Sequence, residues 1–200
     1  MKTFFAAPLA ALVRLFLRPK FTVSADGQRL QGPGVRYRGD ARLKYGVNAT
    51  KNRQAIRGLI IHHPASAKGS SVHNLISLIN RPRADGHMYG YHFVIDVDGA
   101  IYQCAPLTKR TNHIQPRHKR REQGRELNNA NALGLCFHLA SHNPAMAPNA
   151  AQIAAGRGLV AGLIKIYGPL DVFGHGEIQT NRQAGEGRAF AKMIRVGCKS

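Results

Sequence analysis

Short runs of apolar residues recur through the C-terminal three quarters of the chain, and each has the length of a buried strand. The second run alternates apolar and polar positions on both sides of Asp98-Gly99, which predicts a β-hairpin closed by a tight turn. The first run leads directly into His62, and the last leads into Gly174-His175. These runs are residues 58–61, 91–102, 132–139 and 170–173.

Three other segments have the apolar spacing of helices. The first is expected to begin at a cap provided by Ser70 or Ser71 and to end before Pro82. The second covers residues 150–167 and is stopped by Gly168-Pro169, and the third starts near Gly187. The resulting order of elements is β, α, ββ, β, α, β and a final helix. This order predicts an α/β fold with a mixed central β-sheet flanked by helices.

The first twenty residues contain an apolar stretch at 4–17 that Arg14 interrupts. A secretory signal needs an unbroken apolar run, and a transmembrane helix needs about 20 apolar residues. The pattern favours a short basic amphipathic helix, with a signal peptide or membrane anchor as the alternative. Residues 27–46 predict an extended basic arm or a weak strand-and-turn segment. We therefore expect a basic extension over residues 1–53 and one domain over residues 54–200.

The charge is strongly unbalanced, because 29 Lys and Arg residues face 10 Asp and Glu residues, a net charge of +19. Such an excess attracts a polyanion, and nucleic acid, anionic lipid and anionic cell-wall polymers all qualify. No basic-aromatic motif of a nucleic-acid-binding module is present, so no specific nucleic-acid partner is expected. The three cysteines are odd in number and form no CxxC, which argues against a disulfide framework and a zinc ribbon.

Two histidines stand where strand ends would hold them rigidly. His62 follows one predicted strand and His175 follows another. Catalytic zinc uses three protein ligands and leaves one position open for water, so two such histidines suggest part of a zinc site. The spacing cannot establish that site, because the two residues lie far apart in the chain.

Four blocks of the sequence, in order, resemble the type 2 amidase family. This family includes phage amidase lysozymes, bacterial anhydro-muropeptide amidases and animal peptidoglycan-recognition proteins. The resemblance covers about residues 55–195 and implies the family's fold and its hydrolysis of the amide between N-acetylmuramic acid and L-alanine in peptidoglycan. The blocks are Leu59-Ile60-Ile61-His62-His63, Gly90-Tyr91-His92-Phe93-Val94-Ile95 with Asp98-Gly99, Ala132-Leu133-Gly134-Leu135, and Gly174-His175-Gly176-Glu177-Ile178.

The resemblance assigns roles to individual residues. His62 and His175 correspond to zinc ligands, with His63 as the alternative to His62 and otherwise a substrate-binding residue. Tyr91 corresponds to an active-site hydroxyl near the scissile carbonyl. His113 corresponds to a histidine ahead of the central strand that lines the substrate groove, with a structural role as the open alternative.

The third ligand departs from the family pattern. The family's ligand position is Gly185 here, and Glu186 stands one residue later between two glycines. A one-residue shift in so permissive a loop would place the Glu186 carboxylate on the metal, so we expect Glu186 as the third ligand and Glu177 as its rival.

Two further departures concern the catalytic groups. The family's Lys position is Gln183, and Arg182 is the nearest cation that could stabilise an oxyanion. Where some members carry a glutamate in the central strand, the sequence reads Cys136-Phe137-His138. His138 is therefore a candidate general base or oxyanion partner, with a core role as the alternative.

The sequence thus predicts a zinc-dependent N-acetylmuramoyl-L-alanine amidase of phage-endolysin type that acts on the cell wall as a monomer. The basic arm would bring it to an anionic envelope surface, and the export route stays open. The altered third-ligand region leaves a non-catalytic peptidoglycan-binding module as the alternative.

Overall fold

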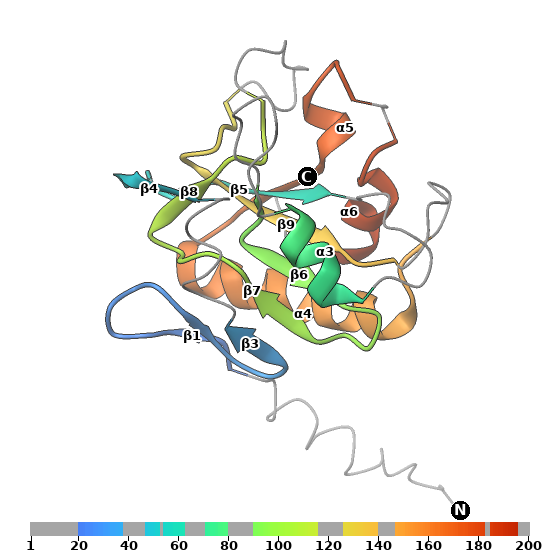
Figure 1. Ribbon diagram of the computed structural model, residues 1–200, viewed down its shortest axis with the longest axis horizontal. Coiled ribbons are helices and arrows are strands. Elements are labelled where there is room, and N and C mark those ends of the chain that lie inside the picture. The colour runs from blue at the N-terminus through green and yellow to red at the C-terminus, as the bar shows by residue number, and fades with distance from the viewer. Residues whose placement is uncertain are drawn as a thin grey trace, which may run out of the picture.

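The computed structural model describes residues 20–37, 47–52, 54–62, 71–79, 90–115, 126–139, 147–182 and 185–195 (Figure 1). The strands are β1 (Thr22–Val23), β2 (Leu30–Gln31), β3 (Val35–Tyr37), β4 (Val47–Asn52), β5 (Gly58–His62), β6 (Phe93–Ile95), β7 (Ile101–Gln103), β8 (Lys109–Thr111), β9 (Ala132–Phe137) and β10 (Asp171–Gly174). The helices are α3 (Val72–Ile79), α4 (Ala150–Tyr167), α5 (His175–Ile178) and α6 (Arg188–Ile194).

A mixed six-stranded sheet forms the centre of the molecule, in the order β10-β5-β9-β6-β7-β3. The first four strands in this order are parallel neighbours, and β7 is antiparallel to β6. The predicted α/β fold with a mixed sheet and flanking helices is therefore confirmed. Because β10, β5, β9 and β6 run in one direction, their carboxyl ends meet at one edge of the sheet.

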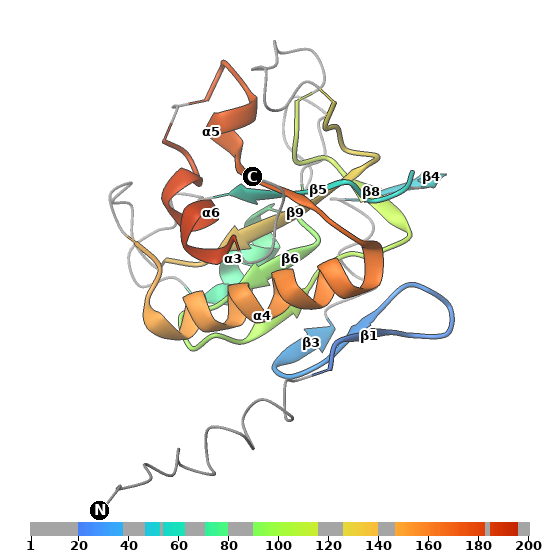
Figure 2. The ribbon, with the colours of Figure 1, turned by 180° about the vertical axis from the view of Figure 1, so that it is seen from behind.

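Helices cover both faces of this sheet, as Figures 1 and 2 show. Leu159 and Leu163 of α4 and Phe190 of α6 belong to the core on one face, which is the largest apolar cluster. The first turn of α3 is capped by Ser71, whose Oγ accepts a hydrogen bond from the Asn74 amide. Residues of α3 form a smaller cluster on the opposite face, together with Val94 and Cys136.

The 18-residue helix α4 has the bounds that the sequence pattern predicts. Asn149 caps its first turn by accepting a hydrogen bond from the Gln152 amide, and the Gln152 side chain accepts one from the Asn149 amide in return. Gly168 ends the helix with a φ of 83°, in the left-handed region that favours glycine.

Part of the region expected as an extension packs on the domain. Strand β3 pairs with β7 at the edge of the central sheet, and Phe21 and Leu30 belong to its main core cluster. The ring of Phe21 lies so close to Gly162 of α4 that a side chain there would collide with it. The domain boundary near residue 54 stays a prediction. Wherever that boundary lies, residues from the range 20–37 contribute to the central sheet and to its core.

The predicted amphipathic helix at 4–17 lies outside the described residues, as does the part of the predicted basic arm over residues 38–46. Within the described ranges, no helix combines the length and apolar character needed to cross a membrane.

Candidate metal centre at the carboxyl edge of the sheet

His62 and His175 meet at the carboxyl edge of the parallel strands. His62 is the last residue of β5, and His175 directly follows β10, the neighbouring strand. Both side chains are buried, and the centroids of their rings lie 4.5 Å apart. The topology has therefore converted a large separation in the chain into direct contact.

Glu186 completes a group of three possible metal ligands with these histidines. One ligand atom from each of the three residues lies within 4.8 Å of the others, and His175 Nδ1 is 3.1 Å from Glu186 Oε1. Ligand atoms about 2.0–2.1 Å from a tetrahedral ion lie roughly 3.3 Å apart, so this spacing suits one ion. Two imidazoles and a carboxylate are also a donor set of catalytic zinc.

Glycines bring the Glu186 loop against the strand ends. Gly187 has a φ of 72°, and a Cβ there would lie 2.2 Å from the Ile61 carbonyl oxygen. A Cβ on Gly174 would likewise collide with the backbone of residues 186–188. The Gly176 amide donates to the Glu186 carbonyl at 3.0 Å. The close approach that positions the carboxylate therefore depends on the absence of side chains at Gly174 and Gly187.

The orientation of the His175 ring is set by Gln179. The Gln179 side-chain oxygen accepts a hydrogen bond from His175 Nε2. Gln179 is fully buried, and its amide group is fixed because its nitrogen donates to the Gln115 carbonyl at 2.8 Å and its oxygen accepts from the Gln115 amide at 3.2 Å. The proton of His175 is thus held on Nε2, and the lone pair on Nδ1 faces Glu186.

His62 has a matching partner in His113. His113 Nε2 lies 3.1 Å from the Ala132 carbonyl oxygen, which can only accept, so that nitrogen carries the proton. His113 Nδ1 then accepts from His62 Nε2 at 3.1 Å, and the lone pair of His62 lies on Nδ1. Both candidate ligands therefore present the same ring atom. The geometry places His113 behind His62, with both of its ring nitrogens engaged inside the protein.

Burial lowers the pKa of His62 well below its usual range, and the nearby charges of His175, His113 and Arg182 add to this effect. His62 is therefore neutral at physiological pH, as a metal ligand must be.

Tyr91 and Arg182 lie beside this group. The Tyr91 ring centroid is 4.5 Å from that of His62, and Arg182 Nε is 4.0 Å from Glu186 Oε2. Glu177, the rival ligand, instead accepts from Arg195 at 2.9 Å and from the Gly174 amide at 2.6 Å. Glu177 therefore stabilises the turn that carries His175.

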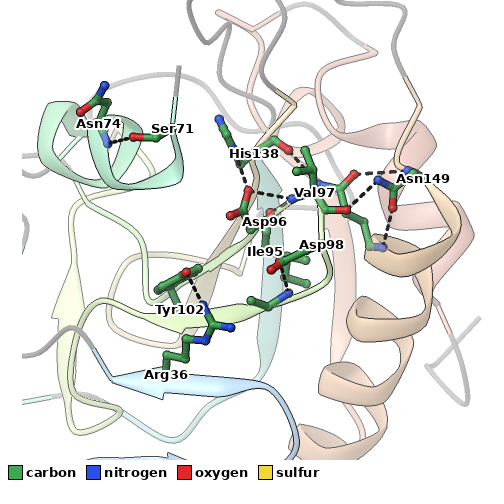
Figure 3. A network of polar contacts seen from close by, with 12 residues as sticks. Arg36, Ser71, Asn74, Ile95, Asp96, Val97, Asp98, Tyr102, His138 and Asn149 are labelled. Carbon is green, nitrogen blue, oxygen red and sulfur yellow. Dashed lines mark hydrogen bonds and ion pairs between the residues drawn. The ribbon is translucent and has the colours of Figure 1, made fainter. Parts of the chain in front are cut away.

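His138 is bound to a different carboxylate. Its Nδ1 lies 2.7 Å from Asp96 Oδ1, which comes from the neighbouring hairpin (Figure 3). His63 lies outside the described residues. Sequence reasoning missed Gln179 and Asp96. The one available signal for Gln179 was its position four residues after His175 in a helical turn, where side chains share a face.

A family model described as N-acetylmuramoyl-L-alanine amidase matches residues 52–188. The chain belongs to the N-acetylmuramoyl-L-alanine amidase family. The predicted resemblance is thereby confirmed, and the enzyme class is that of amidases acting on the peptidoglycan of the cell wall. Among curated proteins, none matches this chain.

Solved structures with the same fold include enzymes and recognition proteins. An endolysin N-acetylmuramoyl-L-alanine amidase from Clostridium intestinale is 18% identical, with a TM-score of 0.57 over 80% of this chain and 93% of its own. Drosophila peptidoglycan recognition protein SD is 16% identical, with a TM-score of 0.59 over 82% and 96%. A human peptidoglycan recognition protein in complex with glycosamyl muramyl pentapeptide is 19% identical, with a TM-score of 0.56 over 84% and 99%.

Proposed function

We propose that this family member is a zinc-dependent amidase that cuts the bond between the lactyl group of N-acetylmuramic acid and L-alanine. The observation that carries the proposal is the convergence of His62, His175 and Glu186. These three residues would hold the ion, which when bound supplies a Lewis acid and an activated water. The complete ligand set favours catalysis over a binding module that has lost its metal.

The residues around the ligands have roles that follow from their positions. Gln179 and His113 keep the ligand rings in the orientation that exposes Nδ1, so the site is preorganised. Arg182 brings a fixed positive charge to the same place and would stabilise the oxygen of the attacked carbonyl as it becomes negative. Tyr91, packed on His62, would donate a hydrogen bond from its hydroxyl to that oxygen.

The basic character of the chain fits an enzyme that works on an anionic envelope. With a net charge of +19, long-range attraction would concentrate it at the cell wall. We further propose that it acts as a monomer of phage-endolysin type. A fold shared with a clostridial endolysin supports this setting.

Mass spectrometry of digested peptidoglycan tests the cleaved bond. We expect new N-terminal L-alanine and intact glycan strands, with activity lost on chelation and restored by Zn²⁺. The control is His175→Ala, which should release nothing. New reducing sugar ends would instead identify a glycosidase, and peptidoglycan binding without any product would support the non-catalytic alternative.

A further inference from the structure

A second polar pair lies on the same sheet edge and is not used by the metal ligands. His138 directly follows β9 and Asp96 directly follows β6, the neighbouring parallel strand. The carboxyl ends of four successive strands thus carry, in sheet order, His175, His62, His138 and Asp96. Side chains at this edge of parallel strands are placed to meet a ligand.

The strand register places this pair close to the metal centre. His62 is paired with Cys136, and His138 follows two residues later. Because residues two apart share a face, His138 lies on the face that carries His62, whereas Leu139 belongs to the core on the other face. Two residues of rise and one strand spacing separate the backbones of His62 and His138 by about 8 Å. One substrate can therefore span both groups.

The pair is held firmly. The Asp96 carboxylate also accepts from the Val97 amide at 2.7 Å, and the Asp96 backbone closes the hairpin turn with Ala100 and Gly99. From α4, the Gln152 side chain donates to the His138 carbonyl at 2.8 Å. Figure 3 shows this network between the hairpin and the start of α4.

The Nε2 atom of His138 takes no part in the contact with Asp96. His138 is 2% exposed, and within the described part of the chain its Nε2 is buried and has no hydrogen-bond partner. Asp96 accepts the proton on Nδ1, so in the neutral ring it is Nε2 that presents the lone pair. A buried imidazole nitrogen without a partner costs free energy, so its retention points to a ligand atom that completes it.

Other titratable groups near this edge are poor candidates for moving a proton. His113 has both ring nitrogens engaged inside the protein, and His62 and His175 have Nε2 engaged and present Nδ1 to the metal-ligand group. Burial raises the pKa of the Cys136 thiol, and the nearby Cys104 and Glu186 raise it further, so Cys136 stays a neutral thiol at physiological pH. His138 therefore has the free nitrogen that proton transfer requires.

We infer that His138, held by Asp96, is the general acid–base group of the amidase reaction, an inference that rests on the function proposed above. His138 Nε2 takes a proton from the attacking water as the water oxygen bonds to the lactyl carbonyl carbon. The carbon–nitrogen bond then breaks, and that proton passes from Nε2 to the departing nitrogen of L-alanine. A carboxyl group and an amine are formed, and His138 returns to its starting state. Asp96 is the positioning residue that fixes the ring and stabilises its charged form.

The test compares His138→Gln and Asp96→Asn with the wild-type protein on a soluble N-acetylmuramoyl-L-alanyl peptide. General acid–base catalysis contributes about 10²–10⁴-fold, so kcat should fall at least 100-fold in His138→Gln, with KM and the Kd for Zn²⁺ unchanged. In Asp96→Asn, kcat should fall by about tenfold or more. Added imidazole should restore part of the activity of His138→Ala, which a purely structural role would not allow.

Asp98→Asn is the matched control, because it removes the same charge from the same turn without contacting His138. It should keep wild-type kcat. Full kcat in His138→Gln, or loss of zinc from it, would overturn the acid–base role while wild-type cleavage leaves the amidase proposal standing. Absence of cleavage by the wild-type protein would overturn both. If His138→Gln does not fold, Asp96→Asn and the imidazole experiment decide the matter.

Discussion

The two halves of the carboxyl edge use histidine in different ways. On the β10–β5 side, His175 and His62 each have Nε2 bound to a buried acceptor, Gln179 or His113, and present Nδ1 toward the ligand group. On the β9–β6 side, His138 has Nδ1 bound to Asp96 and Nε2 without a partner among the described residues. The partner of the second ring nitrogen therefore distinguishes the two proposed roles, holding an ion for His62 and His175 and moving a proton for His138.

Removal of a candidate metal ligand is expected to have the largest effect, and it should distinguish the β10–β5 side of the sheet edge from the β9–β6 side. Because loss of a supporting group alone costs about 10–100-fold in metal affinity, His175→Ala should weaken Zn²⁺ binding by more than about 100-fold and abolish cleavage. Competition with a chromophoric chelator measures the Kd. His138→Gln should keep the wild-type Kd, and equal losses in both variants would erase the distinction.

A substitution in the loop of Glu186 tests whether the close approach of this loop to the strand ends positions the candidate ligand. Gly187→Ala combines a left-handed φ with a backbone collision, and strain of this kind costs about 1–3 kcal/mol. We expect a loss of unfolding free energy of that size in urea, together with weaker zinc binding. Gly185→Ala is the matched control, since its Cβ would meet open space. Equal stability of the two variants would contradict the close approach.

Gln179 accepts the hydrogen bond from His175 Nε2, so its loss should weaken Zn²⁺ binding less than the loss of a candidate ligand does. Gln179→Leu removes the hydrogen bond to Nε2 and should weaken Zn²⁺ binding by about 10–100-fold. Asn181→Ala, which loses a contact to the Gln115 side chain but none to His175, should bind zinc normally. An unchanged Kd in Gln179→Leu would show that the ring needs no such support.

The smallest effect is the pH dependence of stability in the metal-free protein. His62 stays neutral when folded, whereas in the unfolded chain it takes up a proton below about pH 6.5. Unfolding free energy should therefore fall as pH drops from 6.5, with His62 contributing up to about 1.4 kcal/mol per pH unit. Urea titrations at pH 7 and pH 5.5 in chelator measure the slope, which should be shallower in His62→Gln. An identical slope would show that His62 is not held neutral.

Local patterns predicted the elements that carry the candidate metal ligands. The run before His62 became β5, and residues 150–167 became α4. The glycines flanking Glu186 predicted a permissive loop, and the structure shows that it is Gly187 whose missing side chain allows the close approach to Ile61. Such patterns are visible because strand and helix periodicity and glycine chemistry act over a few neighbouring residues.

The sequence alone predicted the mixed α/β fold and the family, and it named His62, His175 and Glu186 as candidate ligands with Glu177 as a rival, since these reside in runs and motifs. Only the tertiary structure decided that Gln179 and His113 orient those ligands, that Asp96 holds His138, and that β3 joins the sheet. Each of these depends on pairing between strands or on a hydrogen bond across turns. No local periodicity records such contacts, because sheet order and register bring together residues that are distant in the chain.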